Sequence, residues 1–178
     1  RLENTEIMKN LVIGQSGGPT AVINASLYGA VKAFRESGAD GHVLGMINGI
    51  EGFLADHVMD LSTDLSDKEL ELLKLTPAAY LGSCRYKLPA DLDSEVYPAI
   101  FDNFREMNIG YFLYVGGNDS MDTVDKLSRY AEKIGSDVKF IGIPKTIDND
   151  LVLTDHTPGF GSAAKYVAST VREIVLDA

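Results

Sequence analysis

Charged and hydroxyl-bearing side chains are concentrated in the segment IPKTIDND, which ends a short apolar run and closes at Asp150. Thr146, Asp148 and Asp150 alternate along this segment, so in an extended chain their side chains would share one face. Carboxylates at the end of an apolar strand are unfavourable unless they bind a metal ion or accept a proton. Lys145 adds a compact positive charge beside them. The pattern predicts a site for a charged ligand, and an Asx-rich turn without a ligand is the alternative.

A glycine-rich turn, GQSGGPT at residues 14–20, follows another apolar run. Gly17 and Gly18 permit a left-handed backbone and let a ligand approach the chain closely. A helix expected from about Thr20 would direct its free N–H groups and its positive dipole end into the same space. Phosphate binding is therefore one interpretation of this turn, and backbone geometry alone is the other.

A second turn, GGNDS at residues 116–120, repeats the order of strand, glycines and helix. Gly117 precedes a helix that we expect to begin near Ser120. Asn118 and Asp119 add oxygen atoms of the kind that Mg²⁺ binds together with water and substrate phosphates. Capping of the helix by Asp119 or Ser120 is the alternative interpretation.

Other reactive side chains are fewer. The motif LGSCR ends in Arg85, which could hold phosphate oxygens in a bidentate manner or could be an ordinary surface residue. Cys84 is expected to be a buried, small apolar residue rather than a reactive thiol. His42, His57 and His156 have no Ser, Cys or His partner at a recognisable spacing, so no chemistry is assigned to them.

Composition and charge narrow the functional class. The 178 residues are 45% hydrophobic, which suits one compact domain with its own core. A net charge of -10 argues against a surface for duplex nucleic acid but does not exclude small anionic ligands. A single cysteine indicates a reducing compartment, and no apolar run is long enough to cross a bilayer. We therefore expect a cytoplasmic protein without nucleic-acid or membrane partners.

Short apolar runs alternate with longer amphipathic segments. The predicted strands are Asn10–Gly14, His42–Ile47, Tyr111–Val115 and Lys139–Ile143. The predicted helices cover residues 21–34, begin at Ser66 with a capping box to Glu69, cover Val96–Met107 and residues 120–134, and begin again at Ser162. This order predicts an α/β fold, a Rossmann-like, mostly parallel sheet sandwiched by helices. Ligands of such sheets bind beyond the carboxyl ends of the strands, where the two glycine turns and PKTIDND lie.

Three regions carry further expectations. The mostly acidic stretch at residues 51–71 is interpreted as a solvated face. Residues 1–7 precede Met8 and are expected to be an addition to the natural chain, and the uncapped last helix suggests that the chain is cut there. That helix carries one apolar stripe, formed by Ala164, Val167, Ala168, Val171 and Val175.

Five motifs stand in one order along the chain: GQSGGPTAVINA, GSCR, GGNDSMDT, PKTIDND and TPGFGSAAKY. Together they resemble the phosphofructokinase family, and the resemblance covers residues 8–178. It implies that these residues form the N-terminal, phosphoryl-donor-binding domain and that the second domain is absent from this chain. It further implies phosphoryl transfer to the 1-hydroxyl of fructose 6-phosphate, Mg²⁺ as cofactor, and a homo-oligomer at full length.

The resemblance also implies roles for single residues. Asp148 would be the general base, and it would contribute to substrate binding with Thr146 and Asp150. Asn118 and Asp119 would hold the metal ion, although Asn118 replaces the aspartate that the family usually has there. The implied catalytic set is Asp148, Lys145 and Arg85, and the implied donor-binding set is Gly17, Gly18, Arg85, Gly117, Asn118, Asp119, Ser120 and Lys145.

The phosphoryl donor depends on two positions. ATP-using family members tend to have glycine where this chain has Asp119 and Lys145, so the chain resembles the pyrophosphate-dependent branch. A carboxylate ~4 Å from an ATP α-phosphate would repel it by about 4 kcal/mol at an effective dielectric constant of 20. An ATP-dependent phosphofructokinase and a non-catalytic regulatory paralogue are the alternatives, and only Asn118 favours the second. A lipid or NAD kinase is more distant, because PKTIDND is not expected there.

Overall fold

The computed structural model describes residues 9–178, so the expectation for residues 1–7 lies outside the described part. The strands are β1 (Asn10–Gln15), β2 (Val43–Met46), β3 (Val58–Asp60), β4 (Ile109–Gly116) and β5 (Lys139–Pro144). The helices are α1 (Ile23–Glu36), α2 (Gly49–Leu54), α3 (Asp67–Leu72), the 3₁₀ helix η1 (Leu73–Leu75), α4 (Val96–Glu106), α5 (Asn118–Ile134) and α6 (Phe160–Asp177).

The five strands form one sheet in the order β3-β2-β1-β4-β5. All neighbouring strands are parallel except β2 and β3, which pair in an antiparallel manner. The mostly parallel α/β fold is therefore confirmed. The chain proceeds from β1 to β2 on one side and later returns to β4 on the other side. The carboxyl ends of β1 and β4 thus form a topological switch point, where ligands of open α/β sheets usually bind.

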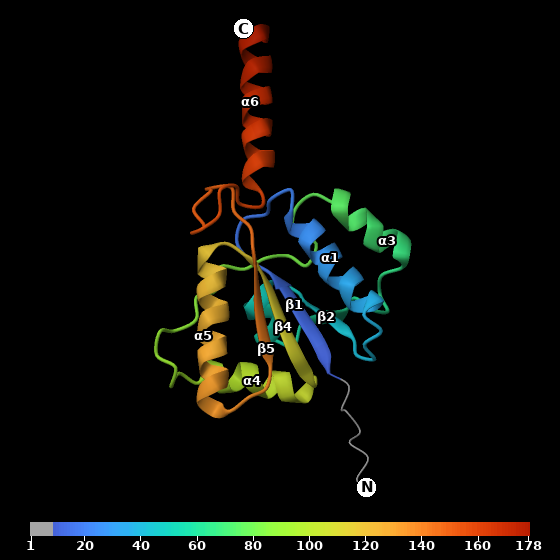
Figure 1. Ribbon diagram of the computed structural model, residues 1–178, viewed down its shortest axis with the longest axis vertical. Coiled ribbons are helices and arrows are strands. Elements are labelled where there is room, and N and C mark those ends of the chain that lie inside the picture. Colours follow the sequence, from blue (N-terminus) through green and yellow to red (C-terminus); the bar gives the residue numbers. More distant parts are fainter. Residues whose placement is uncertain (1–8) are drawn as a thin grey trace.

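Helices cover both faces of the sheet, as the alternation of elements predicts. The central strands direct alternate side chains to opposite faces, so Val12 and Phe112 join one core cluster and Ile13 and Leu113 join the other. The first cluster packs against α2, α4 and α5, and the second packs against α1, α3 and η1. Figure 1 shows α1 and α3 on one side of the sheet and α4 and α5 on the other.

The amphipathic pattern of α1 explains its place against the sheet. Ile23, Leu27 and Val31 recur every four residues, which keeps them on one side of the helix, and all three are fully buried. The predicted capping box at the start of α3 is confirmed. The Ser66 hydroxyl accepts from the backbone N–H of Glu69, and the Glu69 carboxylate accepts from the backbone N–H of Ser66.

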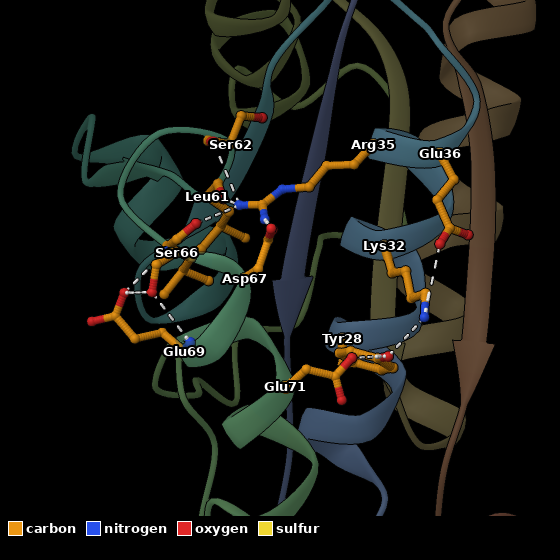
Figure 2. Close-up of polar contacts among 11 residues, drawn as sticks. Tyr28, Lys32, Arg35, Glu36, Leu61, Ser62, Ser66, Asp67, Glu69 and Glu71 are labelled. Atoms are coloured by element: carbon orange, nitrogen blue, oxygen red, sulfur yellow. Dashed lines mark hydrogen bonds and ion pairs between the residues drawn. The ribbon is translucent and has the colours of Figure 1, made fainter.

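Arg35, in the last turn of α1, fixes α3 against α1 (Figure 2). Its guanidinium donates to the carbonyl oxygens of Leu61 and Leu65 at 2.8 and 2.7 Å, and it lies 3.1 Å from an Asp67 carboxylate oxygen. These contacts satisfy backbone carbonyls that the turn before α3 leaves without a strand partner.

Two short elements were not predicted from the sequence, α2 and β3, and both lie in or next to the acidic stretch at residues 51–71. Its carboxylates are mostly exposed, as a solvated face requires, but Phe53, Leu61 and Leu70 are buried. The acidic side chains of this stretch therefore form the solvent-exposed side of elements whose apolar side chains pack into the core. Helix α5 also begins earlier than predicted, at Asn118 with Gly117 as its N-cap.

Helix α6 projects away from the body of the protein, and none of its residues is buried (Figure 1). The predicted apolar stripe is therefore exposed, with Val167, Val171 and Val175 at 57, 53 and 69% exposure. Within residues 9–178, no helix is long and apolar enough to span a membrane.

Candidate phosphate-binding site

A cavity of about 690 Å³ lies where the carboxyl ends of β1, β4 and β5 converge. Four segments form its walls: the turn after β1, the 84–87 segment, the start of α5 and the chain after β5. All the site residues predicted from the sequence line this cavity: Gly17, Gly18, Arg85, Gly117, Asn118, Asp119, Ser120, Lys145, Thr146, Asp148 and Asp150. Their proximity was predicted, and the roles assigned to them stay predictions.

The turn after β1 is held by backbone hydrogen bonds at its base. The Ser16 N–H donates to Val115 O at 2.9 Å, and the Gly17 N–H donates to Cys84 O at 3.3 Å. Gly17 has a φ of 74°, a left-handed conformation that favours glycine. At Gly18, by contrast, an added Cβ would meet no atom within 4 Å. A side chain at Gly18 would therefore not clash with the protein, and its absence leaves open space beside the cavity.

The turn after β4 places the amino end of α5 at the cavity. An added Cβ at Gly116 would lie 2.0 Å from Ser120 Oγ, so the close approach of turn and helix requires glycine there. Gly117 is the N-cap and no side chain caps the helix, so the capping role considered for Asp119 or Ser120 is not what the structure shows. The Ser120 N–H donates to Gly117 O at 3.0 Å, whereas the N–H groups of Asn118 and Asp119 have no acceptor among the described residues and stay available to an anion.

Lys145 is the most deeply placed cation of the cavity, with 3% of its surface exposed. Its Nζ donates to the carbonyl oxygen of Gly18, and it forms no ion pair with a carboxylate within residues 9–178. Burial lowers the pKa of the Lys145 ammonium group below its usual 10.5. A buried positive charge without a counter-ion is unfavourable, and an anionic ligand in the cavity would supply that counter-ion.

The segment after β5 differs from the extended chain considered from the sequence. Strand β5 ends at Pro144, and Asn149 takes a left-handed φ of 54°. Thr146, Asp148 and Asp150 nevertheless all line the cavity. Thr146 is buried, and its hydroxyl accepts from the backbone N–H of Asp148 at 3.0 Å. The exposed Asp148 carboxylate forms no ion pair or hydrogen bond with another described residue. It is therefore available to accept a proton from a ligand.

A folded-back loop fixes this segment, and sequence reasoning missed it. Asn149 accepts from the N–H of Thr157 at 2.9 Å and donates to Asp155 O at 3.1 Å. The buried Thr157 hydroxyl donates to Thr146 O at 3.0 Å. Asn149 tolerates the left-handed conformation better than most residues, and its side chain spans the loop. The asparagine between the two aspartates was the signal in the sequence.

The predicted metal ligands have protein partners. Asn118 Nδ2 donates to Asp150 Oδ2 at 2.6 Å, and Asp119 Oδ1 lies 3.1 Å from Lys87 Nζ. Residues 9–178 contain no group of three His, Cys, Asp or Glu side chains that could hold a metal ion alone. Mg²⁺ usually binds through one or two carboxylates together with water and substrate phosphates. The Asp150 and Asp119 carboxylates at one cavity fit that mode of binding.

A buried pair of amides, Gln15 and Asn24, holds the segment that leads to Arg85, and it was also missed. Gln15 Nε2 donates to Asn24 Oδ1 at 2.9 Å, and Gln15 Oε1 accepts from the Leu81 N–H at 2.9 Å. Asn24 also donates to two carbonyl oxygens of residues 76–78 and accepts from the Tyr80 N–H. All four hydrogen-bonding positions of the Asn24 amide are therefore used.

These features define a class. Glycine turns after two strands, the amino end of α5, a buried lysine and an unpaired carboxylate at the carboxyl edge of a parallel sheet are features expected of a phosphate-binding α/β domain. Helix α1 begins only at Ile23, later than expected, so its amino end does not line the cavity. The sequence profile of the Phosphofructokinase family matches residues 10–178, so the chain belongs to the phosphofructokinase family. The family predicted from the five motifs is thereby confirmed.

Relatives of known name are much longer than this chain. The chain is 46% identical over 171 residues to a pyrophosphate--fructose 6-phosphate 1-phosphotransferase of Halomonas elongata, covering 94% of this chain and 40% of that protein. It is 39% identical over 167 residues to a sulfofructose kinase of Alkalicoccus urumqiensis, covering 94% of this chain and 42% of that protein. A pyrophosphate-dependent phosphofructokinase structure from Nitrosospira multiformis is similar with a TM-score of 0.88 and 43% identity, covering 96% of this chain and 42% of that chain.

Proposed function

We propose that the full-length protein transfers a phosphoryl group from pyrophosphate to the 1-hydroxyl of fructose 6-phosphate, giving fructose 1,6-bisphosphate and phosphate. The observation that carries the proposal is one cavity that joins a buried, unneutralised Lys145 to an unpaired Asp148 carboxylate. The names of relatives at 46% identity support pyrophosphate and fructose 6-phosphate as the substrates. The chain spans about 40% of their length, so we assign it the donor-binding part of the site.

Asp148 acts as the general base in this proposal. Its carboxylate takes the proton of the 1-hydroxyl while the oxygen attacks phosphorus, and the bond from phosphorus to the bridging oxygen of pyrophosphate breaks. Transfers of this kind need in-line positioning and neutralisation of charge more than covalent chemistry. Thr146 and Asp150 help to place the acceptor.

Positive charge and N–H groups hold the donor. Lys145 and Arg85 bind phosphoryl oxygens, and Arg85 forms no ion pair or hydrogen bond with another residue in the described part of the chain. The glycine turns and the first turn of α5 add backbone N–H groups from Gly18, Gly117 and Asn118, while the Ser120 hydroxyl lines the same cavity. The Gly17 N–H is already bonded to Cys84 O, so Gly17 contributes its left-handed backbone rather than a donor.

Asp119 and Asp150, with the Asn118 amide oxygen, are proposed to hold Mg²⁺ beside the donor. When bound, the metal ion neutralises charge on the phosphoryl oxygens. The protein residues supply one or two ligands, and the donor and water supply the others.

The proposal also assigns the reaction to glycolysis and to the cytoplasm, and it expects a homo-oligomer at full length. ATP is the second candidate donor. Pyrophosphate is favoured because the Asp119 carboxylate would lie near an ATP α-phosphate and repel it, and Lys145 would attract a small, highly charged donor. Sulfofructose is a second candidate acceptor, because a relative at 39% identity is named a sulfofructose kinase.

The test is kcat/KM of the full-length protein with both donors and both acceptors. We expect pyrophosphate with fructose 6-phosphate to give the highest value, and Asp119→Gly to raise the ATP value relative to pyrophosphate because repulsion is removed. A parent protein that prefers ATP contradicts the proposed donor. A parent that prefers sulfofructose contradicts the proposed acceptor, and an inactive parent that still binds pyrophosphate indicates the regulatory paralogue.

A further inference from the structure

Three cationic side chains line the candidate site, and they differ in how they are held. Lys145 is buried and fixed on a backbone carbonyl, and Arg85 has no protein partner among residues 9–178. The third, Lys87, lies 3.1 Å from an Asp119 carboxylate oxygen, and the proposed function assigns it no role. Its partner comes from the opposite wall of the cavity, the first turn of α5.

The Lys87–Asp119 ion pair is easy to break. The Lys87 side chain is 73% exposed and the Asp119 side chain is 75% exposed. Water screens such pairs, so they contribute little to stability and exchange readily. Within residues 9–178, no hydrogen bond fixes either charged group to a third residue, unlike Lys126, which is held by both Asp122 and Leu88 O.

When the Lys87–Asp119 ion pair breaks, Lys87 can contact a phosphoryl oxygen of the donor and Asp119 can bind Mg²⁺. Asp119 lies in the first turn of a 17-residue helix, where a negative charge remains favoured without Lys87. Lys87 has a long, flexible stem, and pyrophosphate carries more negative charge than one carboxylate. The ammonium group therefore gains by moving from Asp119 to a phosphoryl oxygen, and Asp119 is then free for Mg²⁺.

We propose that Lys87 is a donor-binding residue that leaves Asp119 and contacts pyrophosphate when the donor enters the cavity. This inference rests on the proposed function and adds a movable cation to the fixed Lys145. In the donor-free protein the ion pair keeps the Asp119 charge neutralised, and in the donor-bound protein it is open.

The experiment measures pyrophosphate affinity calorimetrically, with Mg²⁺ and without acceptor, in the full-length protein. Lys87→Met is expected to weaken binding about tenfold, the size of one lost charge contact of about 1.4 kcal/mol. Lys87→Arg is expected to restore most of the affinity. The decisive comparison is Lys87→Met in an Asp119→Asn background, where we again expect a loss of about tenfold, since Lys87 contacts the donor itself.

The matched control is Lys133→Met. Lys133 on α5 pairs with Asp93, which lies six residues after Lys87, and Lys133 is not among the residues that line the cavity. Lys133→Met is expected to leave pyrophosphate affinity within about twofold of the parent. Thermal unfolding of all variants shows whether folding is retained.

The outcomes separate the two proposals. A parent that binds no pyrophosphate contradicts the proposed function, and this inference falls with it. If the parent binds but Lys87→Met has no effect, the inference alone is wrong. A loss that disappears in the Asp119→Asn background means that Lys87 only neutralises Asp119, which also overturns the inference.

Discussion

A lysine side chain buried without a counter-ion is the feature of the site that is hardest to explain by stability alone. Lys145 is 3% exposed, its Nζ contacts one backbone carbonyl, and burial lowers its pKa. A protein selected only for stability would replace such a group with an apolar side chain. Lys145 is better explained as part of a site prepared for an anion.

The lowered pKa of Lys145 makes stability depend on pH in a defined direction. The unfolded chain keeps its proton up to the usual pKa of 10.5, while the folded chain releases it earlier. Between the two values the unfolded state binds more protons, so the free energy of unfolding gains a term that rises with pH. Urea unfolding of the parent and of Lys145→Met over the alkaline range should differ by this term. Parallel curves would contradict the burial argument.

The same titration affects ligand binding with the opposite sign. Pyrophosphate favours the charged ammonium group, so its affinity should fall as pH rises through the lowered pKa. Lys145→Arg stays charged over this range and should lose that alkaline decline. Calorimetric titrations at several pH values provide the measurement.

At the residue scale, sequence reasoning found the side chains that stand within short motifs. Asp148, Lys145 and Gly17 were identified because neighbouring residues in the sequence already implied a loop with unusual chemistry. Lys87 was missed because its partner Asp119 is 32 residues away and the motif around it looks like a surface segment. A contact between distant segments has no local signal.

At the element scale, the amide pair of Gln15 and Asn24 connects the first strand and helix to the segment that carries Arg85. Both side chains are buried, at 0 and 2% exposure. Asn24→Leu keeps the volume but leaves several backbone groups without partners. Each unsatisfied buried group costs roughly 1–3 kcal/mol, so a loss of about 3 kcal/mol is expected in urea unfolding.

Asn24→Leu should also raise the KM for pyrophosphate more than it lowers kcat, because the segment that leads to Arg85 loses its anchor. The matched control is Asn103→Leu, which removes a hydrogen bond of 2.8 Å to Phe53 O away from the cavity. This control should destabilise the protein without changing the KM. An equal KM change in both variants would show that Asn24 acts through stability alone.

Long helices and strands could be predicted from the sequence, whereas the shortest ones could not. Helix α5 and strand β4 have long, regular patterns, and their existence follows from hydrophobic periodicity. The six-residue α2 and the three-residue β3 are too short to show a period. The strand order was not predicted, because pairing between strands far apart in sequence leaves no mark on either one.

At the scale of the whole molecule, apolar side chains remain exposed on α6 and on the sheet. Helix α6 has no buried residue, and Ile174 and Leu176 are 62 and 70% exposed. On the sheet, Tyr111 of β4 and Ile141 of β5 are 42 and 51% exposed. Exposed apolar surface of this kind favours association.

We therefore expect the 178-residue chain to self-associate in solution through α6. Val171→Glu places a charge in the apolar stripe and should shift the sedimentation profile towards the monomer, with the thermal unfolding of the body unchanged. Ser169→Glu adds the same charge on the opposite side of α6 and should leave the profile as it is. Equal behaviour of the two variants would rule out the stripe as the contact.

The central claim is that this cavity performs phosphoryl transfer with Asp148 as the base, and Asp148→Asn tests it most directly. A positioned base contributes roughly 10²–10⁴-fold, so fructose 1,6-bisphosphate formation from pyrophosphate by the full-length variant should fall by about that factor. Pyrophosphate affinity should stay close to that of the parent, because the Asp148 carboxylate is proposed to contact the acceptor and not the donor. Turnover within a few-fold of the parent would contradict the assignment of Asp148 and the account of the site that depends on it.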